Sequence, residues 1–395
     1  MKKKLLLAFS GGLDTSYCAV HLVKDRGFEV IAATINTGGF EKAAVRQLKE
    51  TAFSLGVSDY IFIDQTTNFY EKGIKYLIFG NILKNNTYPL SVSAERVFQA
   101  MALAHLAVEM KVDAIAHGST GAGNDQIRFD LIFQTICPSI EIITPIRDLA
   151  LSREEEITYL QFHGVQGLWE KALYSINKGL WGTSIGGKET LTSHEALPEE
   201  AFPNQLQNTD YEVVKIKFEN GEPVGLNGST MMPIEVIKRL NEWGGKYAIG
   251  RGLHVGDTII GIKGRIGFEA AGPLMLIKGH HLLEKHTLSK QQLFIKDQMA
   301  AFYGSLMHEG QYLDPAMRDM EAFLSSSQKN VTGVVEIGLA PYRFELLSIQ
   351  SDFDLMQSAL DKYGETNKGW SAADVKGFTK IFSNQTKLYY GLKDA

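Results

Sequence analysis

The chain has 395 residues, of which 44% are hydrophobic and 22% charged, so it is long enough for two domains and has the composition of a globular protein. These values exclude a wholly disordered chain and a fibrous repeat. Forty Lys and Arg residues against 45 Asp and Glu residues give a net charge of -5, which argues against a nucleic-acid partner held mainly by phosphate attraction.

The cysteine content and the amino terminus favour a cytoplasmic protein. Cys18 and Cys137 are too few for a disulfide framework or a thiolate metal site. The basic residues 1–4 and the apolar run Leu5 to Phe9 imitate a signal peptide, but the run is short and leads into glycines rather than a cleavage site. Because no stretch approaches the roughly 18 apolar residues of a spanning helix, we expect no membrane partner.

Residues 1–165 alternate between apolar runs and helical patterns. We expect strands at Leu5 to Phe9, Glu29 to Ile35, Tyr60 to Ile63 and Ala114 to Ala116. We expect helices at Thr15 to Lys24, Ala43 to Leu55 and Ala94 to Met110. This alternation predicts an α/β fold, a doubly wound parallel sheet that binds ligands at its carboxyl edge.

Residues 166–363 differ in character and predict a second, α+β domain. Glycine-punctuated segments follow one another here, and hydrophobic alternation at Tyr211 to Phe218 and at Thr258 to Ile262 is typical of strands. The segment Gly182 to Glu189 resembles a P-loop, but Glu189 stands where a magnesium-binding hydroxyl is required. We therefore interpret that segment as a substrate-binding or structural loop.

Residues 364–395 predict a helical arm. Ser371 to Asp374 resembles a capping box, and Val375, Phe378, Ile381 and Phe382 follow on one helical face. Such an apolar stripe needs a partner surface, which is either the same subunit or a neighbouring one.

The segment Ser10 to Ser16 lies between the first strand and the first helix. Gly11 and Gly12 let backbone amides converge, and the helix start adds partial positive charge, so the segment can cradle a polyphosphate. The simpler reading is a tight turn in which Asp14 or Thr15 caps the helix. The complete string favours the phosphate site.

No protein metal site is expected. His280, His281 and His286 lack an accompanying Cys or acidic ligand pattern, so we expect them at an interface or on the surface.

Two strings carry a family resemblance. Ala8 to Ser16 resembles the pyrophosphate loop (PP-loop) of N-type ATP pyrophosphatases and, in this form, that of the argininosuccinate synthase family. His117 to Phe129 is similar to the long signature of the same family, and it follows a predicted strand. The resemblance covers most of the chain.

The resemblance implies a nucleotide-binding domain like that of the adenine nucleotide alpha hydrolases, a synthetase and multimerisation domain, and a C-terminal oligomerisation arm. It implies condensation of citrulline with aspartate to argininosuccinate in arginine biosynthesis. ATP would be consumed through a citrullyl-AMP intermediate, with release of AMP and pyrophosphate. Mg²⁺ would arrive with ATP, and the enzyme would be a homotetramer.

The resemblance also implies site residues, position by position. Those for ATP are Ala8, Phe9, Ser10, Gly11, Gly12, Leu13, Asp14, Thr15, Ser16, Ile35 and Gly118. Those for aspartate are Thr120, Asn124 and Asp125, and those for citrulline are Tyr88, Ser93, Asn124, Arg128, Ser175, Ser184 and Phe268. The catalytic candidates are Ser10, Asp14, Asn124 and Asp125. If a helix begins near Asn124, Arg128 lies one turn along on the same face, although a helix cap and a surface charge are the simpler readings.

Two positions depart from the family pattern and leave the substrate open. Gly256 stands where the family has an acid facing the amino end of citrulline, and Phe268 stands where it has a tyrosine. Either another residue such as Asp257 substitutes, or the site takes an N-acylated citrulline, whose neutral amide needs no counter-charge. More distant alternatives are a PP-loop tRNA-modifying enzyme and a non-catalytic nucleotide sensor.

Overall fold

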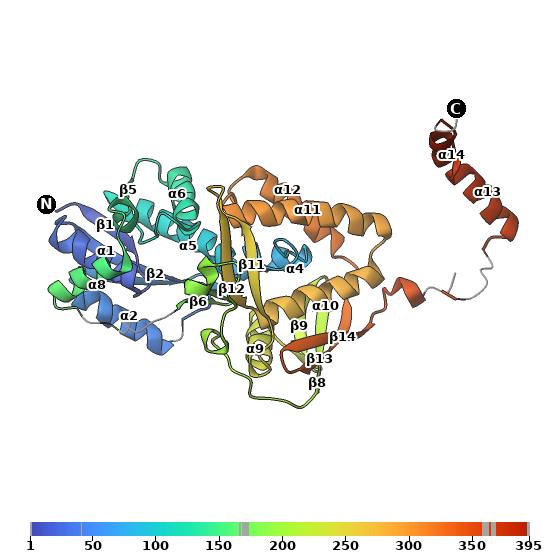
Figure 1. The fold of residues 1–395 in the computed structure, drawn as a ribbon, viewed down its shortest axis with the longest axis horizontal. Helices are drawn as coiled ribbons and strands as arrows, with labels where there is room; N and C mark the ends of the chain where they lie inside the picture. The colour runs from blue at the N-terminus through green and yellow to red at the C-terminus, as the bar shows by residue number, and fades with distance from the viewer. Residues whose placement is uncertain are drawn as a thin grey trace.

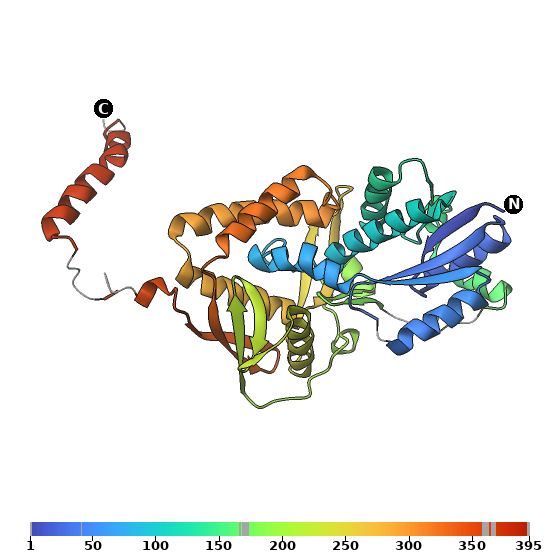
Figure 2. The ribbon, with the colours of Figure 1, turned by 180° about the vertical axis from the view of Figure 1, so that it is seen from behind.

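The computed structural model describes residues 2–40, 42–165, 167, 174–357, 363–364 and 369–392. Figure 1 shows the N-terminal α/β part at one end, two antiparallel sheets with their helices beside it, and the C-terminal helices lying away from the body. Figure 2 shows the same arrangement from behind.

The N-terminal part is built on a parallel sheet in the order β3-β2-β1-β4-β5. Its strands are β1 (Lys4–Ala8), β2 (Glu29–Asn36), β3 (Asp59–Asp64), β4 (Ala114–Ala116) and β5 (Glu141–Ile143). Leu5 and Leu7 pack into one core and Leu6 into another, and all three are fully buried. Helices therefore cover both faces of the sheet, which confirms the predicted α/β fold.

The helices of this part are α1 (Leu13–Lys24), α2 (Lys42–Ser54), α3 (Thr66–Phe69), α4 (Lys75–Phe79), α5 (Ser91–Met110), α6 (Asp125–Ile136), α7 (Pro145–Asp148) and α8 (Arg153–Phe162). The three predicted helices are confirmed to within a few residues as α1, α2 and α5, and the start expected near Asn124 is that of α6, whereas the other helices of this part were not predicted. The order of the strands reverses between β1 and β4, so the loops that follow these two strands flank one crevice at the carboxyl edge.

Two antiparallel sheets and four long helices follow. One sheet has the order β11-β12-β7-β6 and the other β10-β9-β8-β13-β14. The strands are β6 (Ser175–Gly179), β7 (Gly182–Gly186), β8 (Glu212–Glu219), β9 (Glu222–Leu226), β10 (Ser229–Thr230), β11 (Arg251–Asp257), β12 (Lys263–Glu269), β13 (Gly333–Ala340) and β14 (Arg343–Gln350). The helices are α9 (Pro233–Lys246), α10 (Ala271–Thr287), α11 (Lys290–Glu309) and α12 (Pro315–Ser327). Because α5 contacts β1, β2 and β4 as well as β6 and β7, it fixes the smaller antiparallel sheet against the first sheet.

Three expectations for this region are corrected. Thr258 to Ile262 is the turn that joins β11 to β12, not a strand, and its alternation reflects the exposed Ile260 and Ile262. The P-loop-like segment that we interpreted as a loop begins with strand β7, because Gly182 to Gly186 pairs with β6 on one side. His280 is fully buried rather than at the surface, because Asn81 and Gln328 satisfy both ring nitrogens.

The arm contains α13 (Ala372–Phe382) and α14 (Asn384–Gly391), and neither has a buried residue. The predicted capping box is confirmed: the Asp374 amide donates to Ser371 Oγ at 3.3 Å, and the Ser371 amide donates to the Asp374 carboxylate at 2.8 Å. Ile381 and Phe382 are each about three-quarters exposed. The predicted boundaries after residues 165 and 363 stay predictions, since segments beside both lie outside the described residues.

None of the described helices combines the length and the apolar character needed to cross a bilayer. Both cysteines are free and buried.

Candidate active site

A cavity of about 930 Å³ lies at the carboxyl edge of the first sheet, between it and the smaller antiparallel sheet. Most of the predicted site residues line it: Ala8, Phe9, Ser10, Gly12, Leu13, Asp14, Thr15, Ile35, Tyr88, Ser93, Gly118, Thr120, Asn124, Asp125, Arg128, Ser175 and Ser184. Gly11, Ser16 and Phe268 do not line it. The tertiary structure thus brings the predicted ATP, aspartate and citrulline residues to one place.

The glycine turn leaves the start of α1 open. Gly12 is the N-cap and no side chain caps the helix, so the first backbone amides can serve a ligand. Hydroxyl groups stiffen the turn, because Thr15 Oγ1 donates to the Gly12 carbonyl at 3.3 Å and Ser10 Oγ accepts from the Gly12 amide at 3.4 Å. Ser16 Oγ is buried beneath the turn without a hydrogen-bond partner among the described residues.

Two glycines are required by their surroundings. Gly11 has φ +75°, and a Cβ there would lie 2.4 Å from Leu48 Cδ2. Gly118 belongs to the loop after β4, and a Cβ there would lie 3.1 Å from the carbonyl carbon of Asp14. Gly11 therefore provides the left-handed backbone conformation and room for the Leu48 side chain, and Gly118 lets its loop approach the backbone of Asp14.

Asp14 forms a carboxyl pair with Glu156 of α8 behind the turn. Burial and the neighbouring Asp14 charge raise the pKa of Glu156 to about 8, and burial also raises the pKa of Asp14. Glu156 is 3% exposed, and its Oε2 has no hydrogen-bond partner among the described residues. Because two carboxylates in contact repel each other, the pair holds a proton near neutral pH.

Asp125 links two arginines at the opposite wall. Its carboxylate accepts from Arg96 Nε at 2.9 Å and from an Arg128 terminal nitrogen at 2.7 Å. Against the opposing effect of burial, these charges hold the pKa of Asp125 below its usual value. The predicted helix start is confirmed, since α6 begins at Asp125 and the Arg128 amide donates to the Asn124 carbonyl at 3.2 Å. Asn124 Oδ1 also accepts from the Ile259 amide at 2.9 Å, which ties α6 to the β11–β12 turn.

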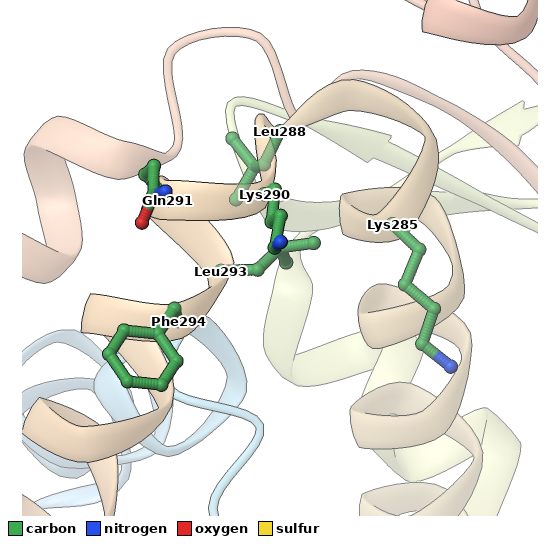
Figure 3. A pocket seen from close by; sticks show the side chains of 6 residues that line it. All are labelled: Lys285, Leu288, Lys290, Gln291, Leu293 and Phe294. Carbon is green, nitrogen blue, oxygen red and sulfur yellow. The ribbon is translucent and has the colours of Figure 1, made fainter. Parts of the chain in front are cut away.

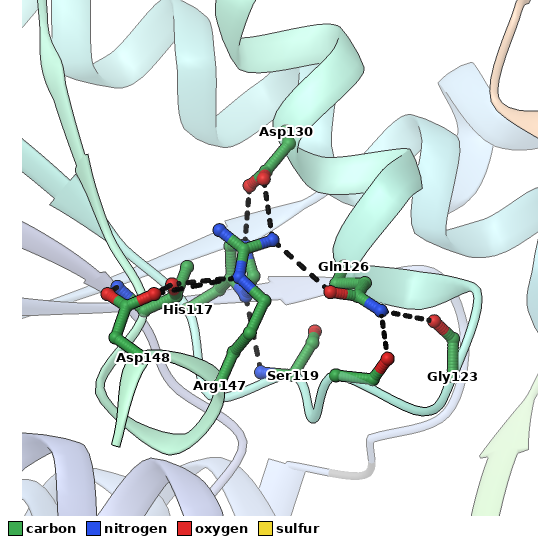
Figure 4. Close-up of polar contacts among 9 residues, drawn as sticks. His117, Ser119, Gly123, Gln126, Asp130, Arg147 and Asp148 are labelled. Atoms are coloured by element: carbon green, nitrogen blue, oxygen red, sulfur yellow. Dashed lines mark hydrogen bonds and ion pairs between the residues drawn. The ribbon is translucent and has the colours of Figure 1, made fainter. Parts of the chain in front are cut away.

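A buried histidine fixes the loop between β4 and α6 (Figure 4). His117 Nδ1 accepts from the Ser119 amide at 3.2 Å, so Nε2 carries the proton and donates to Asp130 at 2.9 Å. Arg147 donates to the same carboxylate at 2.7 Å. The loop that carries Gly118 and Thr120 is therefore held by side chains that reach it from α6 and α7.

Aromatic rings form the wall nearest the β11–β12 hairpin. Tyr88 stacks on His254 with ring centroids 5.2 Å apart and packs against Phe268 at 5.5 Å. Phe268 is 2% exposed and lies in register with Ser184 on β7. Phe268 therefore supports the Tyr88 ring and does not itself line the cavity.

Several lining residues were not anticipated from the sequence. They are Glu95, Arg96, Arg153, Lys178, His254, Arg265 and His308. One of them had a usable signal, because Arg96 follows Ser93 by one helical turn on a predicted helix. The others come from elements whose proximity to the PP-loop depends on tertiary packing.

Another cavity, of about 600 Å³, lies at the junction of α10 and α11, and none of the predicted site residues lines it (Figure 3). Among the described residues, no cluster of three or more His, Cys, Asp or Glu side chains is arranged to hold a metal ion.

A parallel sheet with an open glycine turn after β1 and a second loop after β4 defines an ATP-dependent ligase of the PP-loop type. Two family models match most of the chain. The Arginosuccinate synthase N-terminal HUP domain matches residues 4–166, and the Arginosuccinate synthase C-terminal domain matches residues 174–389.

Curated relatives agree with these matches. The chain is 35% identical to the argininosuccinate synthase of Methanocaldococcus jannaschii, and the alignment covers 98% of each chain. It is 34% identical to the argininosuccinate synthase of Dictyoglomus thermophilum, again over 98% of each. The chain belongs to the argininosuccinate synthase family.

Proposed function

We propose that this protein condenses citrulline with aspartate at the expense of ATP and releases argininosuccinate, AMP and pyrophosphate. One observation carries the proposal: the PP-loop and the Asn124 to Arg128 segment line the same cavity. ATP, citrulline and aspartate can therefore meet within one site.

The open start of α1 binds the departing pyrophosphate. Backbone amides at a helix start stabilise negative charge without reorganisation, and Ser10 adds a hydroxyl donor. Ile35 and Gly118 lie at the ends of β2 and β4, where they would flank the nucleoside. Arg153 lines the same cavity and adds positive charge.

Mg²⁺ would come with the ATP phosphates. The Ser10 hydroxyl lines this end of the cavity and is an oxygen ligand of the type that Mg²⁺ prefers, whereas the Asp14 carboxyl is paired with Glu156. When bound, the ion would neutralise charge that develops on the departing pyrophosphate.

Two displacements give the product. The ureido oxygen of citrulline attacks the α-phosphorus, and the bond to pyrophosphate breaks. The amine of aspartate then attacks the ureido carbon, and the C–O bond to AMP breaks as the new C–N bond forms. Asn124 would lie between the two amino-acid substrates, and Asp125 would orient Arg96 and Arg128 toward their carboxylates.

Pyrophosphate release, measured with ATP, aspartate and citrulline, tests the proposal. Release that requires both amino acids is the expected result. ATP binding without release from any ureido substrate would instead indicate a nucleotide sensor, and release that depends on tRNA would indicate a tRNA-modifying enzyme.

The proposal includes a homotetramer in the cytoplasm. The support for the tetramer is the arm, whose exposed Phe378, Ile381 and Phe382 form an apolar stripe without a partner among the described residues of its own subunit. Deleting residues 369–395 should lower the number of subunits per particle, calculated from the mass measured by light scattering. An unchanged number of subunits would contradict the role of the arm. The support for the location is two buried free cysteines, which fit a reducing compartment.

A further inference from the structure

The cavity ends in a corner where bare backbone meets a buried histidine. Gly256 of β11 and Gly264 of β12 face each other in register, and both line the cavity. A Cβ at Gly256 would lie 2.7 Å from His254 Nε2 and 3.4 Å from Asn85 Nδ2. Gly256 therefore packs against the edge of the imidazole, and this part of the cavity is lined by His254 and by bare backbone instead of longer side chains. We call the part of the cavity lined by His254, Gly256 and Gly264 the glycine corner.

Two cationic side chains, Lys84 and Arg128, lie near the histidines at the glycine corner. Burial first, and then the charges of Arg128 and Lys84, lower the pKa of His308 to about 3. Burial and the charge of Lys84 also lower the pKa of His254. Arg128 lies next to His308, because its Nε donates to the His308 carbonyl at 2.8 Å. An ammonium group placed here would lose hydration on burial and would also be repelled by Arg128 and Lys84, the two effects that lower the histidine pKa values.

The carboxyl groups that line the cavity are engaged elsewhere. Asp125 is held by two arginines, and Asp257 pairs with Lys263 at 2.6 Å on the exposed end of the hairpin. Asp14 pairs with Glu156 behind the PP-loop. Glu95 accepts from Thr37 Oγ1 at 3.1 Å, and its burial raises its pKa to about 7. The α-amino group of citrulline would therefore find no free carboxylate among these four.

His254 supplies a polar contact for a neutral group. It is 6% exposed and stacked on Tyr88, and its Nδ1 is buried without a hydrogen-bond partner among the described residues. Since a buried N–H without an acceptor is costly, the neutral ring would carry its proton on Nε2, the nitrogen nearest Gly256. From that position Nε2–H can donate to a carbonyl oxygen in the glycine corner.

We propose that the ureido substrate is acylated on its α-amino nitrogen, and that the glycine corner receives the acyl group. This inference rests on the proposed function, because it specifies which citrulline derivative occupies the same site. The amide nitrogen of the acylated substrate carries no charge. It is therefore not repelled by Arg128 and Lys84 and needs no carboxylate partner. Its carbonyl oxygen accepts from His254 Nε2, and its carbon chain lies against Gly256 and Gly264.

The test compares kcat/KM for citrulline, Nα-acetylcitrulline and Nα-succinylcitrulline in the full-length enzyme, by pyrophosphate release at saturating ATP and aspartate. We expect at least one acylated form to exceed citrulline by tenfold or more. Equal values, or a preference for citrulline, would overturn the inference and leave the proposed function intact. No release with any of the three would refute the proposed function as well.

A pair of variants locates the acyl group. Gly256→Glu displaces the His254 ring, which a Cβ there would approach to 2.7 Å, and adds a carboxylate to the glycine corner, so it should reduce kcat/KM for the acylated form at least tenfold while improving the relative use of citrulline. Val255→Glu is the matched control, because Val255 is 55% exposed on the other face of β11. If Val255→Glu lowers acylated-substrate use as much as Gly256→Glu does, the glycine corner is not the acyl site. The comparison of the three substrates uses the wild-type enzyme, so it tests the proposal even if a variant fails to fold.

Discussion

The carboxyl pair behind the PP-loop predicts that the stability of the ligand-free protein falls as the pH rises. Glu156 has a pKa of about 8 in the folded protein and an ordinary value of 4.5. Between these two values the folded state holds a proton that the unfolded state has lost. The free energy of unfolding therefore decreases from about pH 4.5 to about pH 8 and then levels off.

The size of the effect follows from the same two values. Each pH unit between them corresponds to about 1.4 kcal/mol, which sets a ceiling of roughly 5 kcal/mol for this group. The interval from pH 5 to pH 8 lies within this window, so a loss of about 3 kcal/mol is the expected magnitude, and the raised pKa of Asp14 acts in the same direction. Glu156→Gln keeps a polar side chain that can donate to Asp14 but does not titrate. It should remove most of this dependence.

Urea unfolding of the two proteins at pH 5, 6.5 and 8 measures the difference. Glu154→Gln is the matched control, because Glu154 lies in the same first turn of α8 but is exposed to solvent. The reasoning fails if wild type and Glu156→Gln lose stability in parallel over this range, or if Glu154→Gln flattens the curve equally.

Two further substitutions probe the packing. Gly11→Ala should lower the free energy of unfolding by about 1 to 3 kcal/mol and raise KM for ATP, because Gly11 has a positive φ and a Cβ there would clash with Leu48. Gly27 has a similar φ, but a Cβ there would meet open space. Comparing the thermal unfolding of Gly11→Ala and Gly27→Ala therefore separates the cost of the backbone conformation from the cost of the clash. Lys296→Met should lower the free energy of unfolding, measured in urea, by about 3 to 5 kcal/mol. The reason is that the variant leaves the fully buried Glu284 carboxylate without the ammonium group that lies 2.9 Å away. A loss below about 1 kcal/mol would contradict a charged Glu284 at this position.

Local sequence signals determined the elements of the first sheet. Leu5 to Phe9 is a continuous apolar run, and Val30 to Ile35 is interrupted only by Thr34, because both faces of a parallel strand are buried. Ser371 and Asp374 likewise encode the start of α13, because a capping box needs only neighbouring backbone. The same reasoning failed at Thr258 to Ile262, where alternating apolar residues lie exposed in a turn and bury nothing.

The strings around Ser10 and Asn124 identified the family from the sequence alone, because in each string the characteristic residues follow one another along the chain. The sequence could not place Glu156 behind Asp14, nor Tyr88 against His254, because these side chains lie on elements far apart in the chain. Their charge states come from burial and from neighbours that only tertiary packing supplies. Short-range patterns thus determined where each strand and phosphate-binding turn begins, whereas the long-range docking of α5 and the β11–β12 hairpin decided the shape and the potential of the cavity.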